Sequence, residues 1–234
     1  MTSSNLLLSS NGPRLVGALS VALLLAVPIA AMAQFNSNDV SKRYQKQSSS
    51  SANIDEQVRK LRSDDPVERL EGVKKLQETN DSKAFEYLIQ AIGDKDVRVR
   101  VKAIEALADM KATVATPVLV QHLFLVTTET PMKQRILAAL GKIGDPAAAR
   151  PITELLQRDL DPATRGTAIY ALGDIGSMDA VTTLERIASK EDENPTLKRL
   201  ANDALGKVRQ QQEARAKEAK GPQETFLEPR EPPQ

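Results

Sequence analysis

Acidic and basic side chains recur four residues apart along the chain, a spacing at which a pair could serve as general acid and general base. The acidic or amide member of each pair starts a unit of 31 to 33 residues. The starts are Asp65, Asp96, Glu129, Asp161 and Asn194, and their basic followers are Arg69, Arg100, Lys133, Arg165 and Lys198. One reaction centre needs a single pair, whereas a ladder that caps helices and links adjacent repeats needs one in every unit. The regular repetition therefore favours the structural ladder.

Two further features could carry chemistry. His122 is the single histidine and could act as a general base, but no Ser or Cys nucleophile is spaced to identify its partner. Gly141-Lys142 and Gly206-Lys207 resemble the end of a phosphate-binding loop, yet a hydrophobic residue follows each Lys where that loop requires Ser or Thr. The chain has no Cys, which excludes thiolate zinc sites and disulfides, and one His excludes a multi-histidine metal site. We therefore expect no catalytic residue, cofactor or metal, and predict that the protein is not an enzyme.

Charge and composition narrow the class of partner. The 234 residues include 32 Lys and Arg against 31 Asp and Glu, so the chain has no general field that would attract a nucleic acid or an anionic membrane. Aromatic residues make up only 3%, and Ala and Leu are abundant. This composition favours helices. We expect a protein or peptide partner and no nucleic acid.

The first 33 residues have the pattern of a secretory signal peptide. Arg14 is the only charged residue before Asp39, and an apolar run from Leu15 to Ala30 follows it. The run is shorter than the roughly 20 residues that span a bilayer, and Ala-Met-Ala at 31–33 fits a cleavage site. We predict cleavage after Ala33, no stable membrane span afterwards, and a periplasmic or secreted protein. An uncleaved membrane anchor is the alternative.

The rest of the chain divides into three parts by composition. Residues 34–52 are polar and include a run of four Ser, which predicts a flexible linker. Residues 53–220 are periodic and predict a helical array with capping helices at both ends. Residues 221–234 hold four Pro among charged residues and predict a disordered tail.

Columns of identical residue types define the repeat. Eleven positions after each start stands a leucine: Leu76, Leu107, Leu140, Leu172 and Leu205. Asp followed by Pro opens a helix, and Gly144 and Gly176 are placed to end one. A second helix is predicted in each of four units, over Lys83–Ile92, Val114–Leu125, Ala147–Gln157 and Met178–Ser189. Each helix pair has one apolar side and can bury it only by stacking on its neighbours, so we predict an all-α solenoid of about five helical hairpins.

The strings that recur are DPATR at 161–165, AIYALGDIG at 168–176 and RILAALGKIGD at 135–145. At these residues the sequence resembles the HEAT-repeat family, in the short-repeat subgroup often called PBS-lyase-like. The resemblance extends over about 64–209 and implies an α-α superhelix of the HEAT/armadillo type.

The two end units depart from the repeat pattern. The unit that starts at Asp65 has Lys-Leu-Gln at 75–77 where other units have Ala-Leu-Gly, which predicts an N-terminal capping unit. Residues 210–220 are charged and almost entirely polar where the last unit should have its second helix. We interpret them as a C-terminal cap or a helix offered to a partner.

The resemblance also implies that the second helices line a concave side. Helical phase places seven side chains outward there: Glu86, Gln90, Gln121, Phe124, Arg150, Glu154 and Arg186. Their mixed charge suits an extended peptide or a partner helix. The leading hypothesis is a non-catalytic protein-binding scaffold or adaptor in the periplasm or extracellular space.

Two alternatives stay open. The subgroup resembles bilin lyases, so the chain could be a lyase-type or chromophore-handling enzyme subunit, although the predicted signal peptide argues against that intracellular work. It could also be a structural component that associates weakly with itself through the exposed end of the solenoid.

Overall fold

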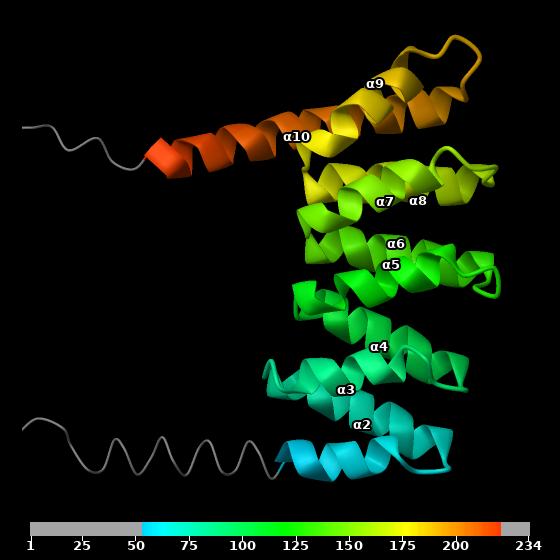
Figure 1. Cartoon of the computed structure of the whole chain (residues 1–234), viewed down its shortest axis with the longest axis vertical. Helices are drawn as coiled ribbons and strands as arrows, with labels where there is room; N and C mark the ends of the chain where they lie inside the picture. The colour runs from blue at the N-terminus through cyan, green and yellow to red at the C-terminus, as the bar shows by residue number, and fades with distance from the viewer. Residues whose placement is uncertain (1–52, 221–234) are drawn as a thin grey trace, which may run out of the picture. The chain divides into compact units, whose positions relative to one another are not determined.

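The computed structural model describes residues 53–220, which lie in one compact unit of the chain. Every regular element within that range is a helix, and it contains no strand (Figure 1), so the predicted all-α fold is confirmed. None of the helices described there combines the length and the apolar character that crossing a bilayer requires. The predicted signal peptide (1–33), linker (34–52) and tail (221–234) lie outside the described residues.

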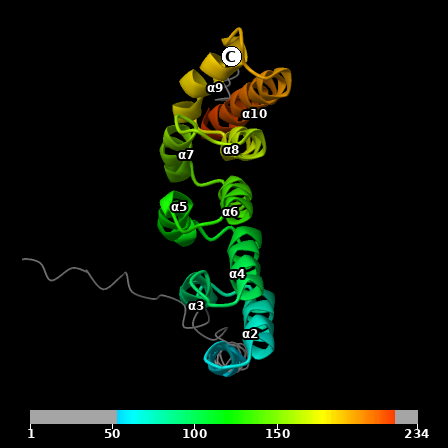
Figure 2. The same ribbon diagram turned by 90° about the vertical axis from the view of Figure 1, so that its right-hand side faces the viewer.

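The helices form two rows, which Figure 2 shows side by side. The first-helix row consists of α2 (Pro66–Thr79), α4 (Val97–Asp109), α6 (Thr130–Ile143), α8 (Pro162–Ile175) and α10 (Pro195–Lys220). The second-helix row consists of the shorter helices α3 (Ala84–Ala91), α5 (Thr116–Phe124), α7 (Ala149–Leu155) and α9 (Val181–Ser189). A 3-10 turn precedes each of the last three: η2 (Thr113–Ala115), η3 (Pro146–Ala148) and η4 (Met178–Ala180).

The unit starts cap the first helices as their residue types predict. The side chains of Asp65, Asp96 and Asp161 accept hydrogen bonds of 2.8, 2.8 and 2.9 Å from backbone N–H groups one turn on. Asn194 does the same for α10 at 2.8 Å, whereas Glu129 makes no such bond. These bonds satisfy donors that the first turn of a helix leaves free. The helix starts were therefore correctly predicted at all five units.

The first helices of the first four units are followed by a residue with left-handed backbone. Gly144 and Gly176, which the sequence marks, have φ of 74° and 65°. The equivalent positions in the first two units are Asn80 and Lys111, with φ of 48° and 50°. A lysine there is unusual because its Cβ crowds the following carbonyl in this conformation. The stack thus imposes the same turn geometry even where no glycine is present.

The five repeat leucines are all buried, as predicted. Leu76, Leu107, Leu140 and Leu172 have no exposed surface, and Leu205 in the last unit is 7% exposed. The alanines that precede four of them are also buried, and two of these, Ala171 and Ala204, lie against the preceding first helix at Gly141 and Gly173. Burial of a leucine side chain contributes about 2 kcal/mol, so this column holds consecutive repeats together.

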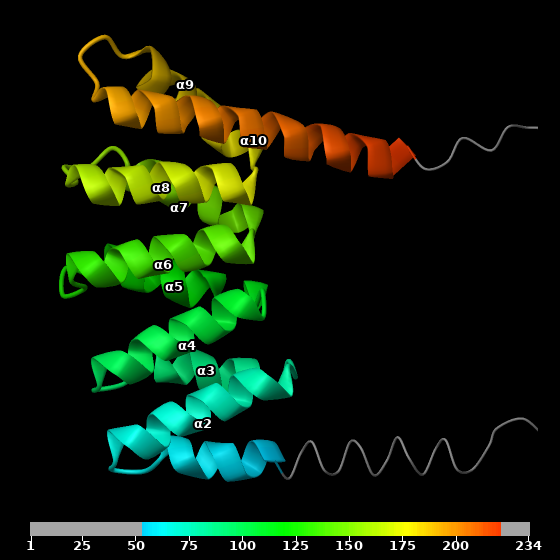
Figure 3. The same cartoon turned by 180° about the vertical axis from the view of Figure 1, so that it is seen from behind.

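Two glycines let first helices approach closely in the C-terminal half of the stack. A Cβ at Gly141 would lie 3.0 Å from the Cα of Ala171, and one at Gly173 would lie 2.9 Å from the Cα of Ala204. Helices α6 and α8 run nearly parallel in Figures 1 and 3, whereas α2 and α4 are tilted relative to them. Small residues at these columns thus allow the tight spacing.

The last helix caps the stack. Gln211 donates its side-chain N–H to the carbonyl oxygens of Gly173 (3.3 Å) and Asp174 (3.1 Å), and Gln212 donates to that of Gly176 (2.7 Å). These carbonyls end α8 and would otherwise lack partners. Residues 210–220 do not form a separate second helix: they continue α10 without a break. The predicted cap is therefore present, as an extension of the first helix.

Candidate functional site

The column of basic residues is structural, but its partners differ from those expected. Arg69 does not pair with Asp65: its Nε and Nη2 donate to both carboxylate oxygens of Asp94, at 2.8 and 2.9 Å. Likewise Arg165 donates from Nη2 to Glu193 at 2.9 Å. Asp94 and Glu193 lie in the loops that lead into the next first helix. Arg69 and Arg165 therefore bind loop carboxylates, whereas Arg100 and Lys198 donate to backbone oxygens of the loop before their own helix. Four of the five unit starts serve as helix caps.

The ion pair between Arg69 and Asp94 has two hydrogen bonds, whereas that between Arg165 and Glu193 has one. Burial raises the pKa of the Asp94 carboxyl, but the hydrogen bonds from Arg69 and from the backbone N–H of Asp96, with the charge of Arg69, outweigh burial. The pKa of Asp94 is therefore lower than that of an ordinary aspartate. A lowered pKa in the folded state means that the ionised carboxylate stabilises the fold.

We expect the Asp94→Asn variant to lose stability at neutral pH and to lose less of it in acid. An unfolded aspartate titrates near pH 3.9. The stabilisation is complete above that value and disappears as pH falls through the lower folded pKa, so the gap between wild type and variant should close below about pH 4. Urea unfolding between pH 7 and pH 3 measures this gap. Asp203→Asn, at an exposed carboxylate that forms no ion pair within residues 53–220, is the matched control; an equal pH-dependent gap there would contradict the assignment.

Charged side chains on the first-helix row are paired across neighbouring repeats. Asp109 pairs with Lys142, and Asp174 pairs with Lys207 at 2.7 Å. The Lys207 Nζ also lies 3.9 Å from the ring centroid of Tyr170, which is 52% exposed. A shallow hollow of about 580 Å³ lies beside this tyrosine, between the N-terminal parts of α8 and α10. Its lining is mostly small or apolar: Pro162, Ala163, Gly166, Thr167, Tyr170, Leu197 and Leu200.

The second-helix row carries the seven residues that helical phase placed outward. Six are exposed, and Phe124 is half-buried against the core. Arg150 forms an ion pair with Asp179 at 3.2 Å, and no ion pair is present for Glu86, Glu154 or Arg186 within the described residues. In Figure 2 the second helices α3, α5, α7 and α9 lie together along one side of the first-helix row.

An apolar hollow lies at the N-terminal end of the second-helix row. It measures about 530 Å³ between α3 and η2, and its apolar lining comes from Phe85, Ile89 and Val114. Glu86 and Gln90, two of the predicted residues, also line it. Val114 was not among the predicted site residues. It is 57% exposed, although an apolar residue in a repeat is usually expected in the core.

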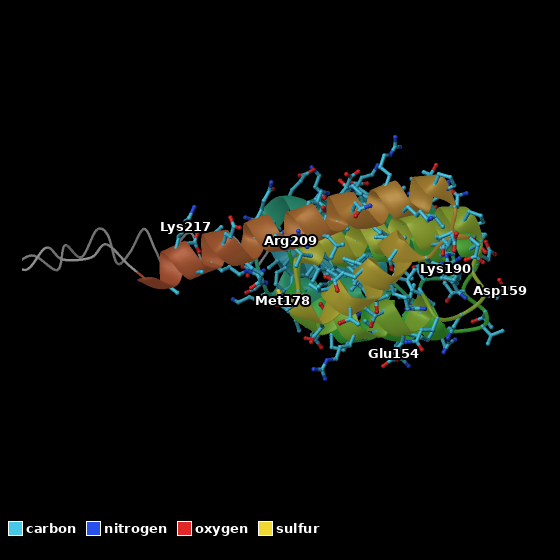
Figure 4. All side chains as sticks on the ribbon, turned by 90° about the horizontal axis from the view of Figure 1, so that it is seen from above. Glu154, Asp159, Met178, Lys190, Arg209 and Lys217 are labelled. Atoms are coloured by element: carbon cyan, nitrogen blue, oxygen red, sulfur yellow. The ribbon has the colours of Figure 1, made fainter. Side chains whose placement is uncertain are left out.

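A second hollow lies at the C-terminal end of the row, between α7 and α9, and we call it the cationic hollow. It measures about 630 Å³, and the charged residues in its lining are Arg158, Arg165, Arg186, Lys190 and Glu193. The remaining lining is Leu156, Gln157, Thr182, Thr183 and Ile187. Figure 4 shows Lys190 and Asp159 on the same lateral edge of the stack. The predicted residue Arg186 thus lies in this hollow together with Arg158 and Arg165, whereas Arg150 does not line it.

His122 lies in a smaller hollow of about 240 Å³ between the first and second helices. Burial lowers the pKa of its imidazole, and the nearby charge of Arg100 lowers it further. The pKa of this imidazole is therefore below that of an ordinary histidine, which disfavours its protonated form. The hydroxyl of Thr128, which also lines this hollow, donates to the backbone oxygen of His122 at 2.7 Å rather than to its ring. Within residues 53–220 no three His, Asp or Glu side chains are grouped to hold a metal ion.

Comparison with known proteins identifies the fold. The model of HEAT repeats matches residues 55–124 and 124–206. No curated protein matches the chain. Among solved structures, the complex of CpcE and CpcF of phycocyanin lyase from Nostoc sp. is similar, with 21% identity and a TM-score of 0.53. The alignment covers 67% of this chain and 65% of that one, so the chain spans about two thirds of the lyase chain.

Human deoxyhypusine hydroxylase in complex with glycerol is a second similar structure, with 16% identity, a TM-score of 0.41, and coverage of 70% of this chain and 87% of that one. These findings correct one prediction. The sequence led us to predict that the protein is not an enzyme. The lyase structure shows that chains of this fold can be subunits of an enzyme, so that exclusion is wrong. Since the two matched segments together extend from residue 55 to 206, the chain belongs to the HEAT-repeat family.

Proposed function

We propose that this HEAT-repeat chain binds a partner protein along its second-helix row, in the periplasm or the extracellular space. The observation that carries the proposal is the pair of hollows at the two ends of that row, one apolar and one cationic. A partner segment laid across α3 to α9 would meet both. Recognition by a row of helices needs such separated anchors, because a few well-packed contacts supply most of the binding energy.

The middle of the row supports the same proposal. Gln121 is exposed between the hollows, and the guanidinium of Arg158 lies 4.6 Å from the ring centroid of Phe124. This contact holds a cation over an aromatic face that is only half-buried. The similar lyase structure is a complex of CpcE and CpcF, which is consistent with protein binding by this fold. The compartment rests on the signal-peptide pattern of residues 1–33.

Site-specific crosslinking in intact cells tests the proposal. A photoreactive amino acid at Gln121 should crosslink to a single envelope or extracellular protein, because Gln121 lies between the two hollows. The same group at Arg135, which is exposed on the first-helix row, is the matched control and should give no such adduct. Exchanging the charges with Arg150→Glu and Glu154→Arg should reduce the Gln121 adduct several-fold. An adduct formed only from Arg135, or a partner confined to the cytoplasm, would refute the proposal.

A further inference from the structure

We infer that the cationic hollow binds carboxylates of an acidic segment of the partner protein. This inference rests on the proposed partner binding and names the chemistry of one anchor. The hollow gathers four cationic side chains, from α8, from α9 and from the residues that follow α7 and α9, and Glu193 is the one carboxylate among the described residues that line it. The cations come from sequence positions up to 32 residues apart, so only the stack brings them together.

Most of this positive charge has no internal counter-ion. Arg165 is paired with Glu193, and Lys190 contacts Asp192 only at 3.8 Å, with side chains 51% and 81% exposed. Such an exposed contact contributes little. Neither Arg158 nor Arg186 has an ion-pair partner within the part of the chain that the structure describes. The hollow therefore has an excess of positive charge, which an incoming anion would neutralise.

Arg165 has further capacity as a donor. Its Nη2 donates to Glu193 at 2.9 Å, but its Nε is buried and has no acceptor among the atoms of residues 53–220. A buried donor without an acceptor is costly. Its neighbours in the hollow, Arg158 and Arg186, are exposed and each presents a planar guanidinium, which binds a carboxylate through two parallel hydrogen bonds.

The remaining lining favours a peptide over a lone oxyanion. Leu156 and Ile187 are buried apolar residues, and Thr182 and Thr183 add hydroxyl groups that can donate or accept. The volume of about 630 Å³ is roughly twenty times the share of one water molecule in the liquid. A segment that places Asp or Glu beside an apolar residue fits this combination. It would continue along the second-helix row past Glu154 towards the apolar hollow.

Fluorescence anisotropy with the full-length chain tests this inference. The probe is a short labelled peptide rich in glutamate with interspersed leucine, and the comparison peptide has glutamine in place of glutamate. We expect the glutamate peptide to bind at least about tenfold more tightly, with an affinity that falls as salt is raised. The double variant Arg158→Gln and Arg186→Gln should weaken its binding by at least about tenfold without changing the circular dichroism spectrum, since both side chains are exposed.

The matched control is Arg209→Gln with Arg215→Gln, which removes the same charge from exposed positions of α10. In Figure 4 Arg209 lies on α10, well away from Lys190. The control variant should bind like the wild type. Equal binding of both peptides, no effect of the Arg158 and Arg186 changes, or displacement of the peptide by inorganic phosphate at similar concentration would overturn the inference. The last outcome would identify a site for free oxyanions.

This test is separable from that of the proposed function. If the crosslink from Gln121 forms but the Arg158 and Arg186 variant retains it and binds the glutamate peptide normally, the inference is wrong and partner binding stands. If the glutamate peptide binds at the hollow and no partner crosslinks from Gln121, the hollow is an anion site and the proposed partner binding along the row is wrong.

Discussion

Replacing Leu140 with alanine should lower the free energy of unfolding by about 3 kcal/mol, within the range of about 2–5 kcal/mol for buried leucines. Leu140 lies on α6 near the middle of the stack and has no exposed surface. Helices α4 and α8 pack on either side of α6, so the surroundings cannot collapse readily into the space that the side chain leaves. The cost should therefore include a cavity in addition to the lost burial.

The position of Leu140 makes the loss consequential for the whole array. Each repeat contacts only its neighbours, so a weakened central repeat uncouples the two ends of the stack. Urea unfolding followed by circular dichroism should show a lower midpoint and a broader or two-step transition. Leu125→Ala is the matched control because Leu125 is 39% exposed at the end of α5, and it should lose less than about 1 kcal/mol. Equal losses in the two variants would contradict the central position of Leu140.

The same substitution should have opposite effects at two glycines of one repeat column. Gly173→Ala places a methyl group 2.9 Å from the Cα of Ala204, so α8 and α10 must separate. The obstacle is a backbone atom that cannot rotate away. We expect this change to lower the free energy of unfolding by about 1–3 kcal/mol, as overpacking does.

Gly206→Ala is the control and should stabilise the protein. Gly206 follows Leu205 in α10 as Gly173 follows Leu172 in α8. Within residues 53–220, however, no further repeat packs against Gly206, and no atom of a packing neighbour lies within 4 Å of an added Cβ. Alanine in a helix interior is favoured over glycine by about 0.5–1 kcal/mol. Thermal and urea unfolding of both variants measure whether the free energy of unfolding falls or rises in each. A stabilising Gly173→Ala would mean that α8 and α10 are not in close contact.

The sequence predicted the repeat and its caps because these depend on residues close together in the chain. Asp161 begins α8 and Gly176 follows its end, at the positions that their residue types favour. The leucine column was equally clear because one residue type returns every 31 to 33 residues. The left-handed turn at Lys111 was missed, since nothing in a lysine side chain signals positive φ.

The candidate site was less predictable. Helical phase correctly placed six of the seven predicted side chains in solvent, but it could not say which of them share a hollow. The sequence paired Arg69 with Asp65, four residues away, whereas the loop carboxylate of Asp94 reaches Arg69 only after α3 has reversed the chain. Enzyme activity was excluded too readily, since the lack of a recognisable catalytic motif says nothing about subunits that act together.

The amino-acid sequence by itself determined the helices, their caps, their buried columns and therefore the stacked architecture. Each of these follows from interactions within one turn of helix or from the need of every hairpin to bury the same apolar side. Only the tertiary structure decided which charges meet. The spacing and tilt of neighbouring repeats set those encounters, so the loop ion pairs and the cationic hollow depend on side chains from different repeats and on how closely Gly141 and Gly173 let the helices approach.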